Sequence, residues 1–161
     1  MFSFKKFIAT AALAFAATTA PANAYQEGGR QLMNALEDAG VEVTVGDCEA
    51  HGLTDTYGFF MPAKNWIHIC SDVATTEAQQ YETLRHEAVH AAQFCVDSSM
   101  EYTVMSTDWI DDNYSKSDWA FIKKAYDKSD WLIEIEAFTL MRYSNWSISK
   151  IVNDRCNWHL Q

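Results

Sequence analysis

The sequence is short of positive charge. Lysine and arginine number 12, against 22 aspartates and glutamates, and the formal net charge of the 161 residues is −10. No segment gathers the basic residues into a patch that could neutralise phosphates, so we expect no nucleic-acid partner. The acidity is more consistent with solubility, or with a mild preference for cationic substrates.

An apolar run long enough to span a membrane is also missing at the N-terminus. The run at residues 7–20 follows a basic segment, 1–6, and precedes an Ala-x-Ala cleavage signal at Ala22-Asn23-Ala24. This order is typical of a secretory signal peptide, and we expect cleavage after Ala24. A retained membrane anchor is the less favoured alternative, because about 14 apolar residues fall short of the roughly 20 that span a bilayer.

Cleavage would leave one domain. Residues 25–161 are enough for a single core, and the loss of Lys5 and Lys6 without any acid changes the net charge from −10 to −12. We therefore expect a signal peptide at 1–24 followed by one domain at 25–161. The protein should be secreted or periplasmic, monomeric, and free of the membrane after cleavage.

What the sequence does contain is an H-E-x-x-H motif formed by His86, Glu87 and His90. The motif lies within 76–94, whose apolar spacing predicts an amphipathic helix capped by Thr75 or Thr76. Positions four apart lie one turn above each other, so both histidines can bind one metal ion. The glutamate beside the first histidine suits a carboxylate that polarises metal-bound water and carries protons. The motif predicts zinc as the cofactor.

A catalytic zinc needs a third protein ligand and leaves its fourth position for water. No glycine or third histidine follows His90 at the spacing of the extended H-E-x-x-H-x-x-G-x-x-H motif. The other source is an acid on a later helix, and the apolar run 131–141 carries Glu134 and Glu136. They lie about 200° apart around a helix, so at most one can face the metal. We favour Glu134, with Glu136 as the alternative.

This arrangement, over residues 80–143, resembles the gluzincin zinc metallopeptidases. In that family the third ligand is a glutamate in an E-x-x-x-D or E-x-x-A-D pattern some tens of residues after H-E-x-x-H. Glu134, three residues before Ala137, falls on the ligand position. Phe138 stands where many members carry the aspartate that orients a zinc histidine, so the partner of that histidine must come from elsewhere.

The resemblance implies hydrolysis of a peptide bond in a peptide, protein or peptidoglycan-peptide substrate. Glu87 would take a proton from the water and deliver it to the leaving amine. A histidine or tyrosine often stabilises the oxyanion in this family, and Tyr114, Tyr126 and Tyr143 are downstream candidates. The alternative is a non-catalytic exported domain that contains a structural metal and binds peptides or cell-wall fragments. The presence of Glu87 favours the enzyme, because a structural site needs only ligands.

The expected fold class is α+β, with a small antiparallel sheet followed by the zincin-like H-E-x-x-H helix and further C-terminal helices. Alternating and helical periodicities predict strands at 41–45, 57–61 and 65–70, and helices at 27–39, 116–126, 131–143 and 147–155. The polar segment 95–115 should be a loop or lid near the site. The resemblance also implies that an edge strand lies above the metal and holds an extended peptide.

C-x-x-C-like pairs, which cysteine zinc sites use, are absent. The four cysteines are therefore expected to form two disulfides, for which three pairings exist. We favour Cys48–Cys70, which would close the strand-rich part, and Cys95–Cys156, which would hold the C-terminal tail to the end of the motif helix.

The remaining histidines are expected to have ordinary surface or packing roles. They are His51, His68 and His159. His68 is of most interest, because its predicted strand should lie near the motif helix.

Overall fold

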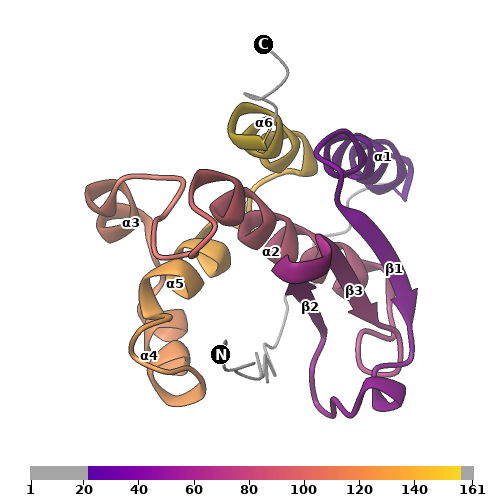
Figure 1. Ribbon diagram of the computed structural model, residues 1–161, viewed down its shortest axis with the longest axis horizontal. Coiled ribbons are helices and arrows are strands. Elements are labelled where there is room, and N and C mark those ends of the chain that lie inside the picture. Colours follow the sequence, from indigo (N-terminus) through magenta and orange to yellow (C-terminus); the bar gives the residue numbers. More distant parts are fainter. Residues whose placement is uncertain (1–21, 157–161) are drawn as a thin grey trace.

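The computed structural model describes residues 22–156, which form an α+β domain of six α-helices and one three-stranded sheet (Figure 1). The helices are α1 (Ala22–Asp38), α2 (Glu77–Val96), α3 (Thr107–Asn113), α4 (Lys116–Ala125), α5 (Trp131–Leu140) and α6 (Asn145–Cys156). The strands are β1 (Glu42–Gly46), β2 (Gly58–Met61) and β3 (Trp66–Cys70). The expected signal peptide lies outside the described residues, apart from 22–24 at the start of α1. Within this range, no helix is long and apolar enough to cross a membrane.

The sheet is mixed, with strand order β1-β3-β2. The expectation of an antiparallel sheet holds for β2 and β3, which are joined by a short 3-10 turn at Pro62–Lys64. It is wrong for β1, which pairs with β3 in parallel. The segment between β1 and β3 contains β2 and reverses the direction of the chain twice, so β3 runs the same way as β1. It is also longer than the dozen residues that a parallel connection needs. Alternating polarity predicts a strand but not its direction.

Helix α2, which carries the motif, begins with a capping box. The Thr76 side chain accepts a hydrogen bond from the Gln79 N–H, and the Gln79 side chain accepts one from the Thr76 N–H. Of the two expected caps, Thr76 is therefore the one used, and each end of the helix lies within two residues of its predicted position.

Helix α2 is the central element of the molecule. It contacts β2 and β3 on one side and α5 and α6 on the other, as Figure 1 shows. Arg85 extends this role, because its Nε donates to the carbonyl of Met141 at 2.6 Å and its Nη1 to Oδ1 of Asn145 at 3.1 Å. The motif helix is thus fixed to both the sheet and the junction of α5 and α6.

The C-terminal helices α4, α5 and α6 follow the prediction, but the expected loop at 95–115 contains α3. Ser106 caps this short helix by accepting a hydrogen bond from the N–H of Trp109. Ile110 is the buried residue of α3 and packs with Ile135 and Phe138. A single buried position gives no period, which is why the sequence pattern missed this helix.

Both disulfides have the favoured pairing. Cys48–Cys70 joins the segment after β1 to the end of β3, with Cα atoms 5.1 Å apart. Cys95–Cys156 joins the last turn of α2 to the last residue of α6, with Cα atoms 5.0 Å apart. No cysteine is free.

Candidate metal centre

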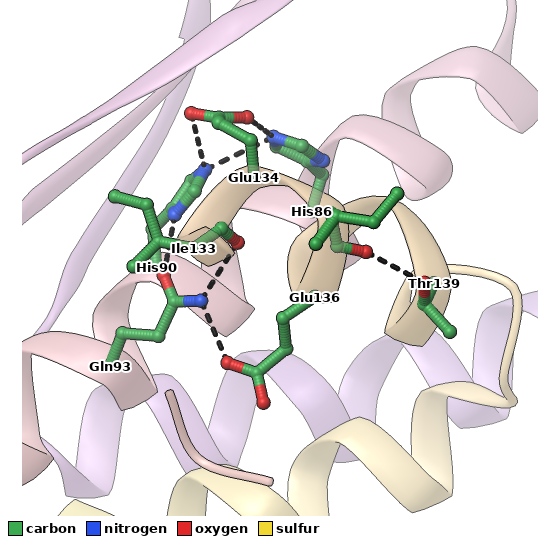
Figure 2. Close-up of polar contacts among 8 residues, drawn as sticks. His86, His90, Gln93, Ile133, Glu134, Glu136 and Thr139 are labelled. Carbon is green, nitrogen blue, oxygen red and sulfur yellow. Dashed lines mark hydrogen bonds and ion pairs between the residues drawn. The ribbon is translucent and has the colours of Figure 1, made fainter. Parts of the chain in front are cut away.

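Three buried side chains converge between α2 and α5 (Figure 2). His86 and His90 project from successive turns of α2, and their Nε2 atoms lie 3.1 Å apart. Glu134, in the first turn of α5, presents Oε2 at 3.4 Å from Nε2 of His86 and Oε1 at 3.5 Å from Nε2 of His90. The exposed fractions of the three residues are 6%, 3% and 0%. The histidines lie far from the acid along the chain, and helix packing brings them into contact.

These separations fit one zinc-sized ion. Zinc binds imidazole nitrogen and carboxylate oxygen at about 2.0–2.2 Å in a tetrahedral arrangement, so two of its ligand atoms lie about 3.3 Å apart. The two imidazole nitrogens are 3.1 Å apart, and each lies 3.4–3.5 Å from one oxygen of the carboxylate, Oε2 for His86 and Oε1 for His90. One ion could therefore be held by all three side chains without moving the helices.

The carboxylate of Glu134 gives independent support. Both of its oxygens are buried, and their close polar neighbours are Nε2 of His86 at 3.4 Å, Nε2 of His90 at 3.5 Å and the hydroxyl of Tyr126. Neither imidazole contact has the geometry of a normal hydrogen bond, and a buried carboxylate needs compensation for the hydration that it loses. A cation held between the carboxylate and the two imidazoles would give that compensation, so the donor set fits a metal ion.

Without a metal, His90 and Glu134 form a buried ion pair. Burial lowers the pKa of His90, but the carboxylates of Glu134 and Glu87 more than offset this and raise it to about 9. Burial raises the pKa of Glu134, but His90 and His86 lower it to about 2. At neutral pH without metal, a protonated His90 therefore faces an ionised Glu134, and a metal ion would have to displace that proton.

Glu87 lies beside the cluster and is also buried. Burial raises the pKa of its carboxyl, although His86 and His90 oppose the shift. The backbone N–H of Phe60, in the edge strand β2, donates a hydrogen bond to this carboxylate. A carboxyl whose pKa is raised and which is held in place by the sheet is a stronger base than a solvated glutamate and is suited to accept a proton.

Glu136 does not face the histidines. Its Oε2 accepts hydrogen bonds from Nε2 of Gln93 and from the N–H of Val104, both at 2.9 Å, and its Oε1 accepts one from the N–H of Met105 at 2.6 Å. Figure 2 shows it on the opposite side of α5 from Glu134. Of the two acids that the sequence left open, the structure brings Glu134 to the histidines.

Sequence reasoning missed Gln93, the fully buried partner of His90. Its Oε1 lies 2.7 Å from Nδ1 of His90, and its Nε2 donates to the carbonyl of Ile133 at 2.9 Å. The only signal was its position three residues after His90, on the same face of α2. Phe138, at the position of the family aspartate, instead packs edge-on against the ring of His86, with centroids 4.8 Å apart.

Of the three candidate tyrosines, Tyr126 faces the cluster. Burial raises the pKa of its hydroxyl, the charges of Glu134 and Glu87 raise it further, and the hydroxyl donates a hydrogen bond to Glu134. Tyr114 packs against Trp119, and Tyr143 packs against Trp109.

The other histidines lie apart from the cluster. His68 and His51 pack together on the face of the sheet opposite to Ile67 and Ile69, with ring centroids 5.1 Å apart, and Nδ1 of His68 lies 2.7 Å from Oγ1 of Thr44. His159 lies outside the described residues.

A second group of potential ligands lies near the first disulfide. It consists of Cys48, Cys70 and Asp72. Both cysteines are bonded to each other, so they have no thiolate with which to bind a metal.

A scan against protein-family models, a search of curated proteins and a search of solved structures each found no match for this chain.

Proposed function

We propose that this protein is an exported zinc metallopeptidase that hydrolyses peptide bonds, with His86, His90 and Glu134 as its metal ligands. The observation that carries the proposal is the convergence of two imidazole nitrogens of one helix on the fully buried Glu134 carboxylate of another, at 3.4 and 3.5 Å. A structural zinc is usually closed by four protein ligands. Three ligands with a buried acid beside them instead match a catalytic zinc. The two disulfides support export.

Glu87 is the proposed general base. Zinc in this site would supply a Lewis acid that polarises a carbonyl and lowers the pKa of a water molecule to about 7. Glu87 would accept the proton of the attacking water and deliver it to the leaving amine. The raised pKa of its carboxyl makes it a stronger base than a solvated glutamate. The N–H of Phe60 would hold that carboxylate in one orientation.

Strand β2 is suited to bind an extended peptide. The N–H of Cys70 donates to the carbonyl of Tyr57, so Tyr57, Phe59 and Met61 pair with β3. In an antiparallel pair the alternate residues, here Gly58 and Phe60, direct their main-chain groups to the other edge. Because β2 is an edge strand, that edge could accept a further strand at the groups other than the Phe60 N–H, which already donates to Glu87. Its hydrogen bond to Glu87 brings it next to the proposed base.

Tyr126 is the proposed oxyanion donor. Its hydroxyl stays protonated at neutral pH, because burial and the nearby carboxylates raise its pKa. Its single hydrogen is donated to Glu134 in this structure, so it would have to turn from that carboxylate, once a metal holds it, to the oxygen that becomes negative in the transition state.

The near-complete burial of the cluster favours a second candidate, the non-catalytic exported domain with a structural metal. Exposed fractions of 6%, 3% and 0% leave little room for substrate unless another part of the protein moves. The two functions differ in whether Glu87 is needed for anything besides folding.

The first test is the zinc content of the purified exported protein and two matched variants, Glu134→Gln and Glu136→Gln. We expect near-stoichiometric zinc in the wild type and in E136Q, and loss of zinc in E134Q. Both positions are fully buried on α5, so E136Q shows the effect of removing a buried carboxylate that is not a ligand. Because Glu136 holds Gln93, the partner of His90, E136Q should bind zinc more weakly than the wild type without losing it. A folded wild type that takes up no zinc after supplementation would overturn the proposal.

The second test separates the enzyme from the binding domain. Glu87→Gln should keep its zinc and lose cleavage of a mixed peptide library by a factor of about 100 or more, as expected for removal of a general base. A zinc-loaded wild type that cleaves neither peptides nor peptidoglycan peptides would support the non-catalytic alternative.

A further inference from the structure

A continuous line of buried hydrogen bonds connects the metal cluster to the segment between α2 and α3. It runs from Nδ1 of His90 to Gln93, from Gln93 to Glu136, and from Glu136 to the N–H groups of Val104 and Met105. We propose that Gln93 and Glu136 form a positioning pair that fixes the tautomer and orientation of His90 and couples them to the 97–106 segment. This inference rests on the proposed metal site.

The amide of Gln93 has one orientation that satisfies its neighbours. Its nitrogen carries two hydrogens, and both are used, one on the carbonyl of Ile133 and one on Oε2 of Glu136, each at 2.9 Å. Both partners are acceptors only, so the amide nitrogen must face them and the amide oxygen must face His90. The Glu136 carboxylate therefore determines which end of the amide the histidine meets.

An amide oxygen can only accept a hydrogen bond, so the hydrogen between Gln93 and His90 must belong to Nδ1. The neutral imidazole then has its free lone pair on Nε2, the atom that faces Glu134 and His86. A partner on the distal nitrogen of a metal-binding histidine fixes the tautomer in this way. In many such sites a carboxylate contacts the histidine directly. Here the amide of Gln93 makes that contact, and the Glu136 carboxylate accepts a hydrogen bond from the amide.

Glu136 also connects this pair to the chain between α2 and α3. Its oxygens accept the N–H groups of two consecutive residues, Val104 and Met105, and Arg155 of α6 donates to the carbonyl of Val104 at 2.7 Å. If this segment moved away, Glu136 would lose two of its three donors and would hold the Gln93 amide less firmly. The position of the segment is thereby linked to the orientation of a metal ligand.

The test combines zinc affinity, measured by competition with a chelator, with ¹H–¹⁵N NMR of the histidine side chains. In zinc-loaded wild type, we expect His90 to show a slowly exchanging Nδ1–H. Gln93→Leu should lose that signal and bind zinc about 10–100-fold more weakly, the range known for removal of such a partner. Thr139→Val is the control, because Thr139 is a buried polar residue of α5 whose hydroxyl bonds only within its own helix.

A swap variant tests the mechanism rather than the mere presence of polar groups. Q93E combined with E136Q puts the carboxylate directly on His90 and an amide against the 97–106 segment. It should restore the Nδ1–H signal, because the acceptor on His90 is restored, and only part of the zinc affinity, because the carbonyl of Ile133 loses the donor that the Gln93 amide supplies. Amide exchange at Val104 and Met105 should become faster, because the amide that replaces the Glu136 carboxylate has one acceptor oxygen for two N–H groups.

The outcomes separate this inference from the proposed function. Wild-type affinity with an intact Nδ1–H signal in Q93L, or no recovery of that signal in the swap variant, would overturn the positioning pair while zinc binding by the wild type stands. A wild type without zinc would overturn the proposed function. In that case, a protected Nδ1–H in metal-free wild type that disappears in Q93L would still support the pair.

Discussion

If His90 is a zinc ligand as proposed, it connects metal binding to pH. Its pKa is raised to about 9 by Glu134 and Glu87, whereas a zinc ligand must be a neutral imidazole. Zinc would therefore have to displace the His90 proton at pH values below about 9. Glu134 should not make zinc affinity depend on pH near neutrality, because its pKa is lowered to about 2 and it is already ionised there.

We expect zinc affinity to rise about tenfold per pH unit between about pH 7 and 9 and then to level off, as release of one proton requires. Chelator competition across this range measures the slope. Calorimetry in buffers with different ionisation enthalpies counts the released proton. An affinity that is flat from pH 7 to 9 would mean that His90 is already neutral in the metal-free protein.

At the residue scale, the sequence predicted the residues with distinctive chemistry and missed those defined by packing. The H-E-x-x-H spacing is a property of one helix, so it identified His86, Glu87 and His90 without knowledge of the fold. Choosing Glu134 over Glu136 needed the rotation of α5 against α2, which depends on contacts between distant parts of the chain. Gln93 could not be identified at all, because a glutamine three residues after a histidine is common on exposed helix faces.

At the element scale, the close approach of β2 to α2 depends on Gly58. A Cβ at this position would lie 2.5 Å from Cγ2 of Thr83 on α2 and 2.8 Å from the carbonyl oxygen of His68 on β3. The second contact is with backbone, so a side-chain rotation cannot relieve it. The strand would have to move, and with it the N–H of Phe60 that donates to Glu87.

Gly58→Ala should therefore lower the free energy of unfolding by about 1–3 kcal/mol, the usual cost of overpacking, and should lower activity with little loss of zinc. Urea denaturation measures the stability, zinc analysis the metal content, and cleavage of the peptide library the activity. Adding Thr83→Ser removes Cγ2 and should recover part of the stability, since the contact with His68 remains. A G58A protein with wild-type stability would show that the strand accommodates the methyl group.

Elements with a clear period were predicted well, and those without one were not. Strands β1, β2 and β3 alternate and were found, but the parallel pairing of β1 depends on the path of the intervening chain, which alternation does not encode. Helix α3 buries little besides Ile110 and was missed for that reason. The expected amphipathic pattern of α2 is also incomplete, because Thr83 to Gln93 is buried almost all round.

At the scale of the whole molecule, the burial of α2 explains how polar groups come to lie in the interior. The sheet covers one side of the helix, while α5 and α6 cover the other. His86, Glu87, His90 and Gln93 therefore occupy core positions, where each needs a partner. The proposed metal site and the hydrogen bonds behind it provide these partners, so function and packing use the same residues.

The disulfide between the ends of α2 and α6 supports this arrangement from outside the metal site. Cys95 and Cys156 are separated by 61 residues, and removing such a crosslink typically costs about 2–5 kcal/mol through the greater freedom of the unfolded chain. The proposed ligands, however, come from α2 and α5, which pack directly against each other. Loss of this bond should therefore weaken the fold without dismantling the site.

Cys95→Ala combined with Cys156→Ala should lower the urea midpoint and keep near-stoichiometric zinc at 25 °C. The pair Cys48→Ala and Cys70→Ala is the matched comparison. The disulfide that this variant removes joins residues only 22 positions apart. On chain entropy alone, its loss should lower the free energy of unfolding by about 1 kcal/mol less than loss of Cys95–Cys156. Urea denaturation with zinc analysis at each concentration measures both properties. The contrary outcome is that the first variant loses zinc at urea concentrations where its far-UV spectrum is still that of the folded protein. In that case α6, and not only the contact between α2 and α5, is needed to hold the ligands in place.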